Sequence, residues 1–112
     1  MRGPALRGFC EAVFSKCDVL HAPVVGFATP TIAQADVGGS PEMMAVLGRI
    51  TRLTRPINYL GLPALAVPAG FQPGGLPTAM QLIGRPFDEA TLFALGHAYQ
   101  GATDWHARAP AL

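Results

Sequence analysis

Side chains that could act as nucleophiles are few in this chain of 112 residues. They are two serines, Ser15 and Ser40, a single lysine, Lys16, and two cysteines, Cys10 and Cys17. A hydroxyl or thiol becomes an effective nucleophile when a neighbouring base takes its proton. Both cysteines fall on the apolar stripe of an expected helix, where burial suppresses thiol reactivity. We therefore interpret them as buried thiols, and their spacing of two helical turns is too long for a disulfide.

The three histidines, His21, His97 and His106, could pair with a thiol or hold a metal ion. A thiol–imidazole pair is spatial and not sequential, so this alternative stays open. His97 and His106 are nine residues apart, with an expected helix end between them, which is not the spacing of a metal site. Asp88 and Glu89 are adjacent acids at an expected helix start, where the helix dipole accounts for them. We predict no metal site and no cofactor.

Composition narrows the class of protein further. Half of the residues are hydrophobic and the mean hydropathy is +0.31, so the chain is too apolar to be disordered. Eight basic and seven acidic residues leave a formal charge of +1, which favours neither nucleic acid nor an anionic membrane as partner. No apolar run approaches the roughly 18 residues of a membrane span, and the N-terminus lacks the apolar core of a secretory signal. We expect one domain in a cytoplasmic setting.

The elements that must position these side chains follow from hydrophobic periodicity and turn residues. Apolar residues at helical spacing predict a helix over residues 5–16. A short apolar run over 19–22, stopped by Pro23, predicts a buried strand, and residues 23–39 predict a long loop. Loops of that length usually lie over a functional face or belong to a larger body.

A second helix is predicted over residues 42–55. Ser40 is its expected N-cap, because a proline and an acid follow it, and Pro56 marks its expected end. Three arginines at a spacing of three lie on its polar side and suit either a solvated face or an anion-binding role. They are Arg49, Arg52 and Arg55.

Two strands and a third helix complete the prediction. Residues 62–68 form a nearly continuous apolar run typical of a strand buried on both faces, with 64–68 its most secure part. Residues 78–83 predict a second strand, antiparallel to the first because the connection is short. Asp88 is the expected N-cap of a helix over 89–100 that Gly101 closes, and the tail is irregular. The predicted fold class is α/β, a partial mixed sheet with flanking helices.

An ordered series of segments carries a family resemblance. The segments are residues 58–71 (NYLGLPALAVPAGF), 75–77 (GLP), 81–89 (QLIGRPFDE), 97–100 (HAYQ) and 103–106 (TDWH). The chain resembles the C-terminal portion of the amidase signature family. The resemblance implies that residues 1–112 are a single, incomplete domain whose strands extend a larger sheet. It also implies hydrolysis of a carboxamide by a serine nucleophile, a second serine in a cis peptide and a lysine.

The family's catalytic residues do not carry over to this chain. The resemblance places its serines and lysine upstream of the matched region, and Pro41 follows Ser40 where a second serine should stand. We therefore expect no catalytic residue here and a chain that is inert alone. In family members that act on glutamine, an aspartate at the position of Thr51 is implied to hold the amino group, so Thr51 points away from glutamine. Thr54 and Asn58 complete the candidates for the substrate pocket, although Asn58 also suits a structural role at the Gly61 turn.

Two function classes remain. The first is the C-terminal part of an amidase that acts on a small-molecule amide, with its nucleophile supplied by an upstream region. The alternative is a non-catalytic, amidase-like interaction module or partner subunit. In either case a strand as apolar as 62–68 needs more cover than three helices provide, so we expect exposed apolar surface. A homodimer or pairing with the missing half of an amidase would cover it.

Overall fold

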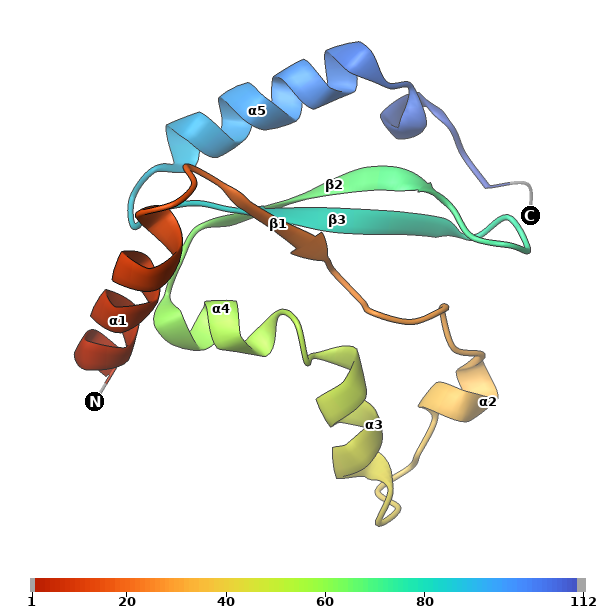
Figure 1. Ribbon diagram of the computed structural model, residues 1–112. Coiled ribbons are helices and arrows are strands. Elements are labelled where there is room, and N and C mark those ends of the chain that lie inside the picture. Colours follow the sequence, from red (N-terminus) through yellow and green to blue (C-terminus); the bar gives the residue numbers. More distant parts are fainter. Residues whose placement is uncertain (1, 111–112) are drawn as a thin grey trace.

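The computed structural model describes residues 2–110 (Figure 1). The elements in chain order are α1 (Arg2–Phe14), β1 (Leu20–Pro23), α2 (Ile32–Ala35), α3 (Met43–Ile50), α4 (Arg55–Leu60), β2 (Ala64–Phe71), β3 (Pro77–Ile83), α5 (Glu89–Ala102) and the 3-10 helix η1 (Trp105–Ala107). The α/β class is confirmed. None of the helices in this part of the chain is long and apolar enough to cross a membrane.

The three strands form one sheet in the order β1-β3-β2. β2 and β3 form a hairpin, whose register shifts between Pro68 and Gly70, and the predicted antiparallel pairing is confirmed. β1 joins the other edge of β3, also antiparallel. The sequence predicted a mixed sheet, but the strands of the described region pair only in antiparallel fashion. The tight hairpin sets β2 against β3, and β1 runs opposite to β3 as well.

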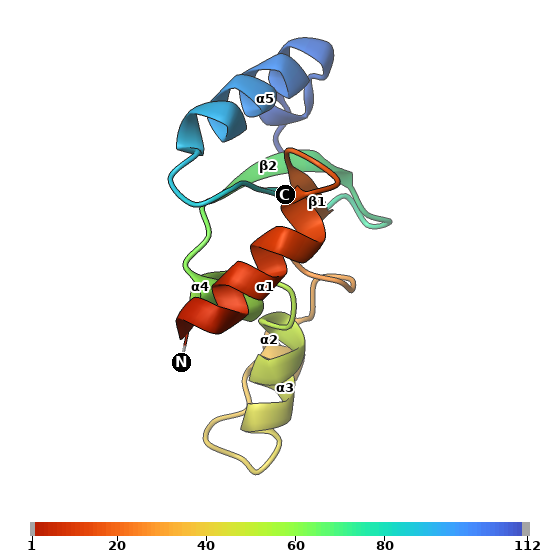
Figure 2. The ribbon, with the colours of Figure 1, turned by 60° about the vertical axis from the view of Figure 1, so that its left-hand side comes forward.

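Helices lie on both sides of this sheet, so the core is divided into two clusters (Figures 1 and 2). Adjacent residues of β3 face opposite ways. Ile83 packs with α1 and α4 through Phe14, Ile57 and Leu60. Leu82 packs on the other face with Val67 and with Leu92 of α5.

The expected burial of residues 62–68 on both faces is only partly found. Leu62 and Val67 are buried, but Ala64 and Ala66 are exposed. Their face of β2 is the one that points away from α5, and α1 and α4 cover only the Ile83 end of that side. The predicted exposed apolar surface therefore exists.

The single helix predicted over 42–55 is wrong, because the structure has two helices there. α3 ends at Ile50, and the chain turns before α4 begins at Arg55. Pro56 stands in the first turn of α4, where its missing N–H costs nothing, so it starts a helix instead of ending one. α4 then ends at Gly61, whose φ of 72° is the left-handed conformation that glycine adopts freely.

Ser40 is not the predicted N-cap. The residue at that position of α3 is Glu42, and it caps without a side-chain hydrogen bond. A hydrogen bond with the Ser40 side chain instead lowers the pKa of Glu42. The predicted loop over 23–39 also contains a short helix, α2. It begins with a capping box, in which the side chains of Thr31 and Gln34 each accept a hydrogen bond from the backbone N–H of the other residue.

The predicted helices over 5–16 and 89–100 are confirmed with shifted ends. α1 begins earlier, at Arg2, and α5 continues to Ala102, so Gly101 lies within α5 and does not close it. Asp88 is the N-cap of α5, but its carboxylate accepts a hydrogen bond from the Thr91 hydroxyl (2.7 Å) and none from the helix backbone.

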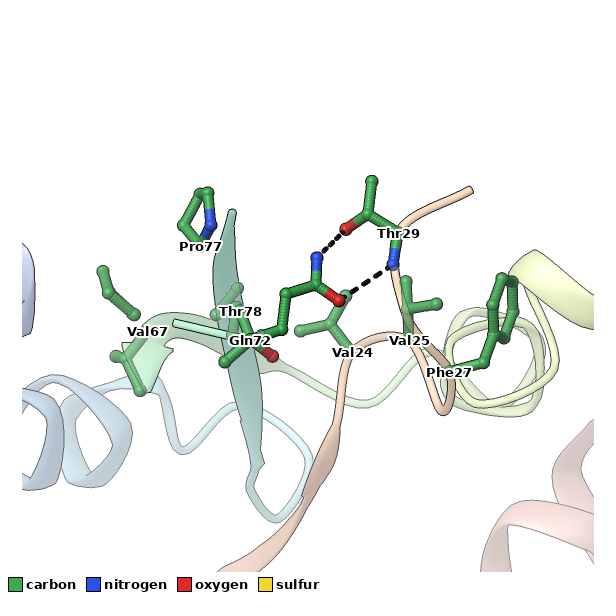
Figure 3. Close-up of a pocket in the computed structure, with 11 residues that line it drawn as sticks. Val24, Val25, Phe27, Thr29, Val67, Gln72, Pro77 and Thr78 are labelled. Atoms are coloured by element: carbon green, nitrogen blue, oxygen red, sulfur yellow. Dashed lines mark hydrogen bonds between the residues drawn. The ribbon is translucent and has the colours of Figure 1, made fainter. Parts of the chain in front are cut away.

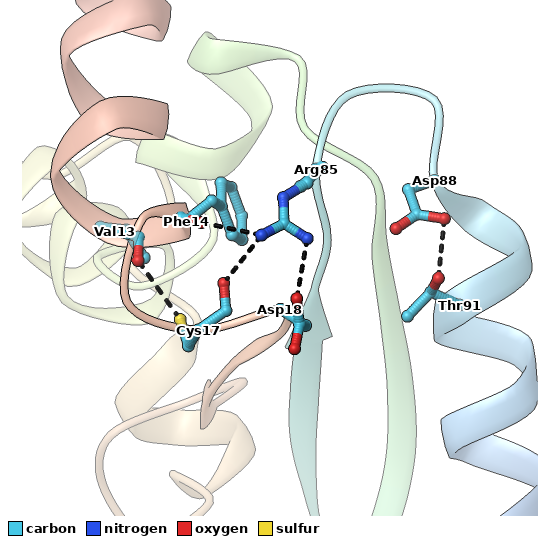
Figure 4. A network of polar contacts seen from close by, with 7 residues as sticks. All are labelled: Val13, Phe14, Cys17, Asp18, Arg85, Asp88 and Thr91. Carbon is cyan, nitrogen blue, oxygen red and sulfur yellow. Dashed lines mark hydrogen bonds and ion pairs between the residues drawn. The ribbon is translucent and has the colours of Figure 1, made fainter.

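Arg85 fastens the end of α1 to the segment that follows β3 (Figure 4). Its guanidinium donates to the carbonyl oxygens of Phe14 (2.8 Å) and Cys17 (3.3 Å) and to the carboxylate of Asp18 (3.0 Å). It also lies over the Phe14 ring, 5.7 Å from its centroid. One side chain therefore satisfies carbonyls that the helix end leaves free.

α5 approaches the sheet most closely at Gly96. A methyl group built there would come within 2.6 Å of the terminal carbon Cδ2 of Leu65 on β2. Despite this contact the molecule is flat, measuring 41 × 40 × 18 Å, and its radius of gyration is 16.2 Å. A compact domain of this length has a radius of about 13 Å. Large apolar side chains remain exposed on several helices and loops, including Phe87 (95%) and Phe93 (65%).

Candidate functional site

The buried side chain of Gln81 organises the region that holds the predicted pocket residues. Gln81 is only 4% exposed, and its Nε2 donates to the carbonyl oxygens of Pro23 and Leu53, both at 3.1 Å. One amide group therefore holds two irregular segments, the chain after β1 and the turn between α3 and α4, against β3. This role was not predicted from the sequence. The available signal was a polar residue at an inward-facing position of an otherwise apolar strand.

Two of the predicted pocket residues meet on the turn that Gln81 holds. Thr51 ends α3, and its hydroxyl donates to the carbonyl oxygen of Leu47 (2.7 Å). Thr54 precedes α4, and its hydroxyl donates to the carbonyl oxygen of Thr51 (3.4 Å). Both hydroxyl protons are therefore used within the backbone of the turn, and only the oxygen lone pairs remain available to a ligand.

Asn58 lies one helical turn further along α4. Its carbonyl oxygen accepts a hydrogen bond from Gly61 N–H (3.2 Å), so its backbone has the structural role that was considered for its side chain. The side chain is exposed, and within residues 2–110 it makes no hydrogen bond. Contact of Thr51, Thr54 and Asn58 with a substrate stays a prediction.

A mostly apolar hollow lies between β2, β3 and the chain that follows β1 (Figure 3). Its volume is about 440 Å³, and its walls include Val24, Phe27 and Ala66. At its rim the Gln72 side chain bonds Thr29 twice, as acceptor from the backbone N–H (3.1 Å) and as donor to the hydroxyl (2.7 Å). Hollows of this size and lining commonly take small organic ligands.

The candidate nucleophiles do not form a catalytic group in the part of the chain that is described. Ser15 and Lys16 are exposed at the end of α1, and Ser40 lies on the loop between α2 and α3. Cys10 and Cys17 are free and partly buried against the core formed by α1 and α4, and the Cys17 thiol donates to the Val13 carbonyl oxygen at 3.5 Å.

Acids and histidines likewise form no metal site among residues 2–110, where no three potential ligands gather. A second carboxyl with a lowered pKa, besides that of Glu42, lies outside the turn: a hydrogen bond from Arg108 lowers the pKa of Asp104, an exposed residue before η1. This ion pair lies far along the chain from the candidate site and has no catalytic partner there.

The described residues thus define an α/β structure with a mostly apolar hollow on its sheet. The model of the amidase family matches residues 2–93, so the chain belongs to the amidase family. The matched residues correspond to the C-terminal portion of the amidase fold.

Curated relatives agree with this assignment. The chain is 46% identical over 102 residues to a glutamyl-tRNA(Gln) amidotransferase subunit of Chloroflexus aggregans, covering 91% of this chain and 20% of that protein. It is 45% identical over 107 residues to the protein of the same name from Roseiflexus sp., covering 96% and 21%. The Chromobacterium violaceum protein is 42% identical over 102 residues, covering 91% and 20%. The chain spans about one fifth of the length of these relatives.

Proposed function

We propose that this chain is the C-terminal part of an enzyme that hydrolyses the C–N bond of a small carboxamide. The family match over residues 2–93 is the observation that carries this proposal. The flat shape and the open face of β2 support it, because both leave room for the rest of a larger sheet. In this proposal the domain formed by residues 1–112 is completed by an upstream region.

The nucleophile and base come from outside these residues in the proposed enzyme. A serine oxygen attacks the amide carbonyl carbon, and the C–N bond breaks as the nitrogen leaves with a proton relayed by lysine. Water then hydrolyses the acyl-serine ester, which releases the acid and restores the serine. The turn of Thr51 and Thr54 and the hollow on β2 and β3 contribute part of the substrate-binding wall.

The proposed substrate is an amide other than glutamine, although the relatives are named as glutamyl-tRNA(Gln) amidotransferase subunits. Recognition of an α-ammonium group calls for an anionic partner. Thr51 carries no charge, and its hydroxyl proton is used by the Leu47 carbonyl. The site turn therefore offers no carboxylate to such a group.

An interaction module or partner subunit is the competing function. The exposed side chains of Phe87 and Phe93 favour it, since apolar surface of this kind commonly marks a contact with another chain. Pairing with an amidase half, or a homodimer, would cover these residues. In both proposals we place the protein in the cytoplasm, in keeping with its two free thiols.

Genomic sequence immediately upstream separates the two proposals. An open reading frame continuous with this chain, carrying a Gly/Ser-rich segment with two serines and a lysine, supports the amidase. The protein encoded by that complete frame should release ammonia from simple amides, whereas the 112-residue chain should release none. Absence of such a frame, or a complete and folded product that hydrolyses no amide, favours the interaction module.

A further inference from the structure

Two of the three regularly spaced arginines line a hollow next to the candidate site. Arg49 and Arg52 border a space of about 370 Å³ together with Gly26, Phe27 and Leu53. The guanidinium of Arg49 lies over the Phe27 ring, 5.1 Å from its centroid. Arg55, the third member of the series, lines neither this hollow nor its neighbour. The structure thus distinguishes Arg49 and Arg52 from Arg55, a difference that their regular spacing in the sequence does not predict.

A second hollow adjoins the first and has an apolar wall. It measures about 490 Å³ and shares Phe27 and Arg49 with the first, and Val46 and Ile50 of α3 contribute to its lining. Neither lining contains an aspartate or a glutamate. The combined space therefore offers positive charge at one point and hydrocarbon surface beside it.

Neither arginine has an anionic partner in the described structure. The ion pairs found within residues 2–110 are Arg85 with Asp18 and Arg108 with Asp104. Two guanidinium groups that border one hollow repel each other, and a bound anion removes that repulsion. Arginine also presents paired N–H groups whose geometry matches a carboxylate.

The two walls of this hollow are joined by contacts that do not depend on a ligand. A methyl group built on Gly26 would lie 3.3 Å from Cδ1 of Leu53, so the loop and the turn already touch. Gln81 bonds the carbonyl oxygens of Pro23 and Leu53, which flank the same contact. The arginines therefore project from a segment whose position relative to the loop at Gly26 is set by the fold.

We propose that Arg49 and Arg52 bind the carboxylate of the amide substrate. This inference rests on the proposed function and specifies its substrate class, the monoamide of a dicarboxylic acid. The apolar wall from α3 and Phe27 contacts the methylene chain of the substrate. No acidic side chain lines the two hollows, so an ammonium group would have no partner there. A phosphate shares the anionic chemistry, but the hydrocarbon side chains of Val46 and Ile50 beside the arginines favour an organic acid.

Binding to the 112-residue chain tests the anion site without requiring catalysis. Succinamate is titrated into the 15N-labelled chain and followed by NMR, with butyramide as a neutral amide of similar size. Arg49→Gln and Arg52→Gln should each raise the dissociation constant of succinamate about three- to fivefold, or ~0.7–1 kcal/mol at 1.4 kcal/mol per tenfold. Added salt should weaken succinamate binding and leave butyramide binding unchanged.

Arg55→Gln is the matched control, because it removes the same charge from the same segment outside the hollow. It should leave the dissociation constant within about 1.5-fold, the size expected of a screened, distant charge. Equal losses in all three variants would overturn the proposal in favour of a general charge effect. Tighter binding of inorganic phosphate than of succinamate would overturn the carboxylate assignment.

The activity of the enzyme encoded by the complete reading frame distinguishes this inference from the proposed function. A higher kcat/KM for succinamate than for butyramide, lost in the double variant of Arg49 and Arg52, supports both. Equal hydrolysis of the two amides overturns the carboxylate site and leaves the amidase proposal intact. Binding that depends on the two arginines, in a folded enzyme that hydrolyses no amide, overturns the amidase proposal alone.

Discussion

Replacement of Gln81 by methionine should destabilise the protein more than the same replacement at Gln72. Each glutamine side chain makes two hydrogen bonds, Gln81 with Pro23 and Leu53 and Gln72 with Thr29, so the number of bonds lost is equal. The bonds of Gln81 come from a side chain that is 4% exposed, whereas those of Gln72 lie at the surface. Methionine keeps the length of the side chain and removes only its polar amide.

The expected magnitude follows from the number of bonds and their burial. A buried hydrogen bond contributes about 1 kcal/mol net, so Gln81→Met should cost about 2 kcal/mol. The cost rises further if no water donates a hydrogen bond to the carbonyl oxygens of Pro23 and Leu53, because an unsatisfied buried acceptor costs about 1–3 kcal/mol. Water replaces the lost bonds of Gln72, whose substitution should change the free energy of unfolding by less than about 0.5 kcal/mol.

Thermal or denaturant unfolding measures this difference directly. For a domain of this size, 2 kcal/mol lowers Tm by roughly 8–16 °C, at about 4–8 °C per kcal/mol. Equal shifts for the two methionine variants would refute the argument, since burial is the property that separates them.

Gln81→Glu provides an independent check through pH. An ionised carboxyl at this position would face two carbonyl oxygens, and only the protonated form can donate to one of them. Its pKa should therefore be raised in the folded state. A raised pKa means that stability is greatest below the ordinary pKa of about 4.3 and is lost as pH rises through the folded value. A Tm that does not fall between pH 4 and 7 would contradict this account.

Three further predictions concern α1, α5 and the exposed surface. Arg85→Ala should lower the free energy of unfolding by about 1–2 kcal/mol through its lost carbonyl contacts, whereas Arg108→Ala, which removes an exposed ion pair, should cost less than about 0.5 kcal/mol in denaturant titrations. Gly96→Ala should be less stable than Gly101→Ala by up to about 1 kcal/mol, because both gain helix propensity and only the first must displace the end of the Leu65 side chain; equal stabilities would contradict the close approach. The isolated chain should self-associate or bind an apolar dye, and Phe93→Ser should reduce both in size-exclusion and fluorescence assays; a monomeric wild type that binds no dye would show that its surface needs no cover.

Elements with a strong local pattern could be predicted from the sequence. The periodic apolar residues of α1 and the apolar runs of β2 and β3 each specify one structure, and the short connection specifies an antiparallel hairpin. The region 40–56 was harder, because its apolar spacing continues through the break at residues 51–54. Pro56 suits both the residue after a helix and the first turn of the next, so the pattern alone did not choose between them.

The candidate site was only partly accessible from sequence for a different reason. Thr51 and Thr54 are close in the chain, so their proximity on one turn follows from local structure. The contact of Leu53 with Gly26 and the bonds of Gln81 join segments that are 27 to 58 residues apart. Nothing in the local pattern predicts such contacts, and they are what places Arg49 and Arg52 on a hollow.

Buried residues are unevenly distributed over the structure, and the segment that carries Arg49 and Arg52 has few of them. α2 and α3 contain no buried residue, whereas the two core clusters lie along α1, α4, α5 and the strands. The segment that carries the arginines is therefore held by the bonds of Gln81 and by the contacts of Leu53 with Gly26 and of Arg49 with Phe27, and it should open locally at a lower free energy than the sheet. A ligand that bridges the two walls would stabilise this segment first, because the walls adjoin each other only while the segment is folded. The buried amide of Gln81 thus links the rigid sheet to the part of the structure where binding can change the most.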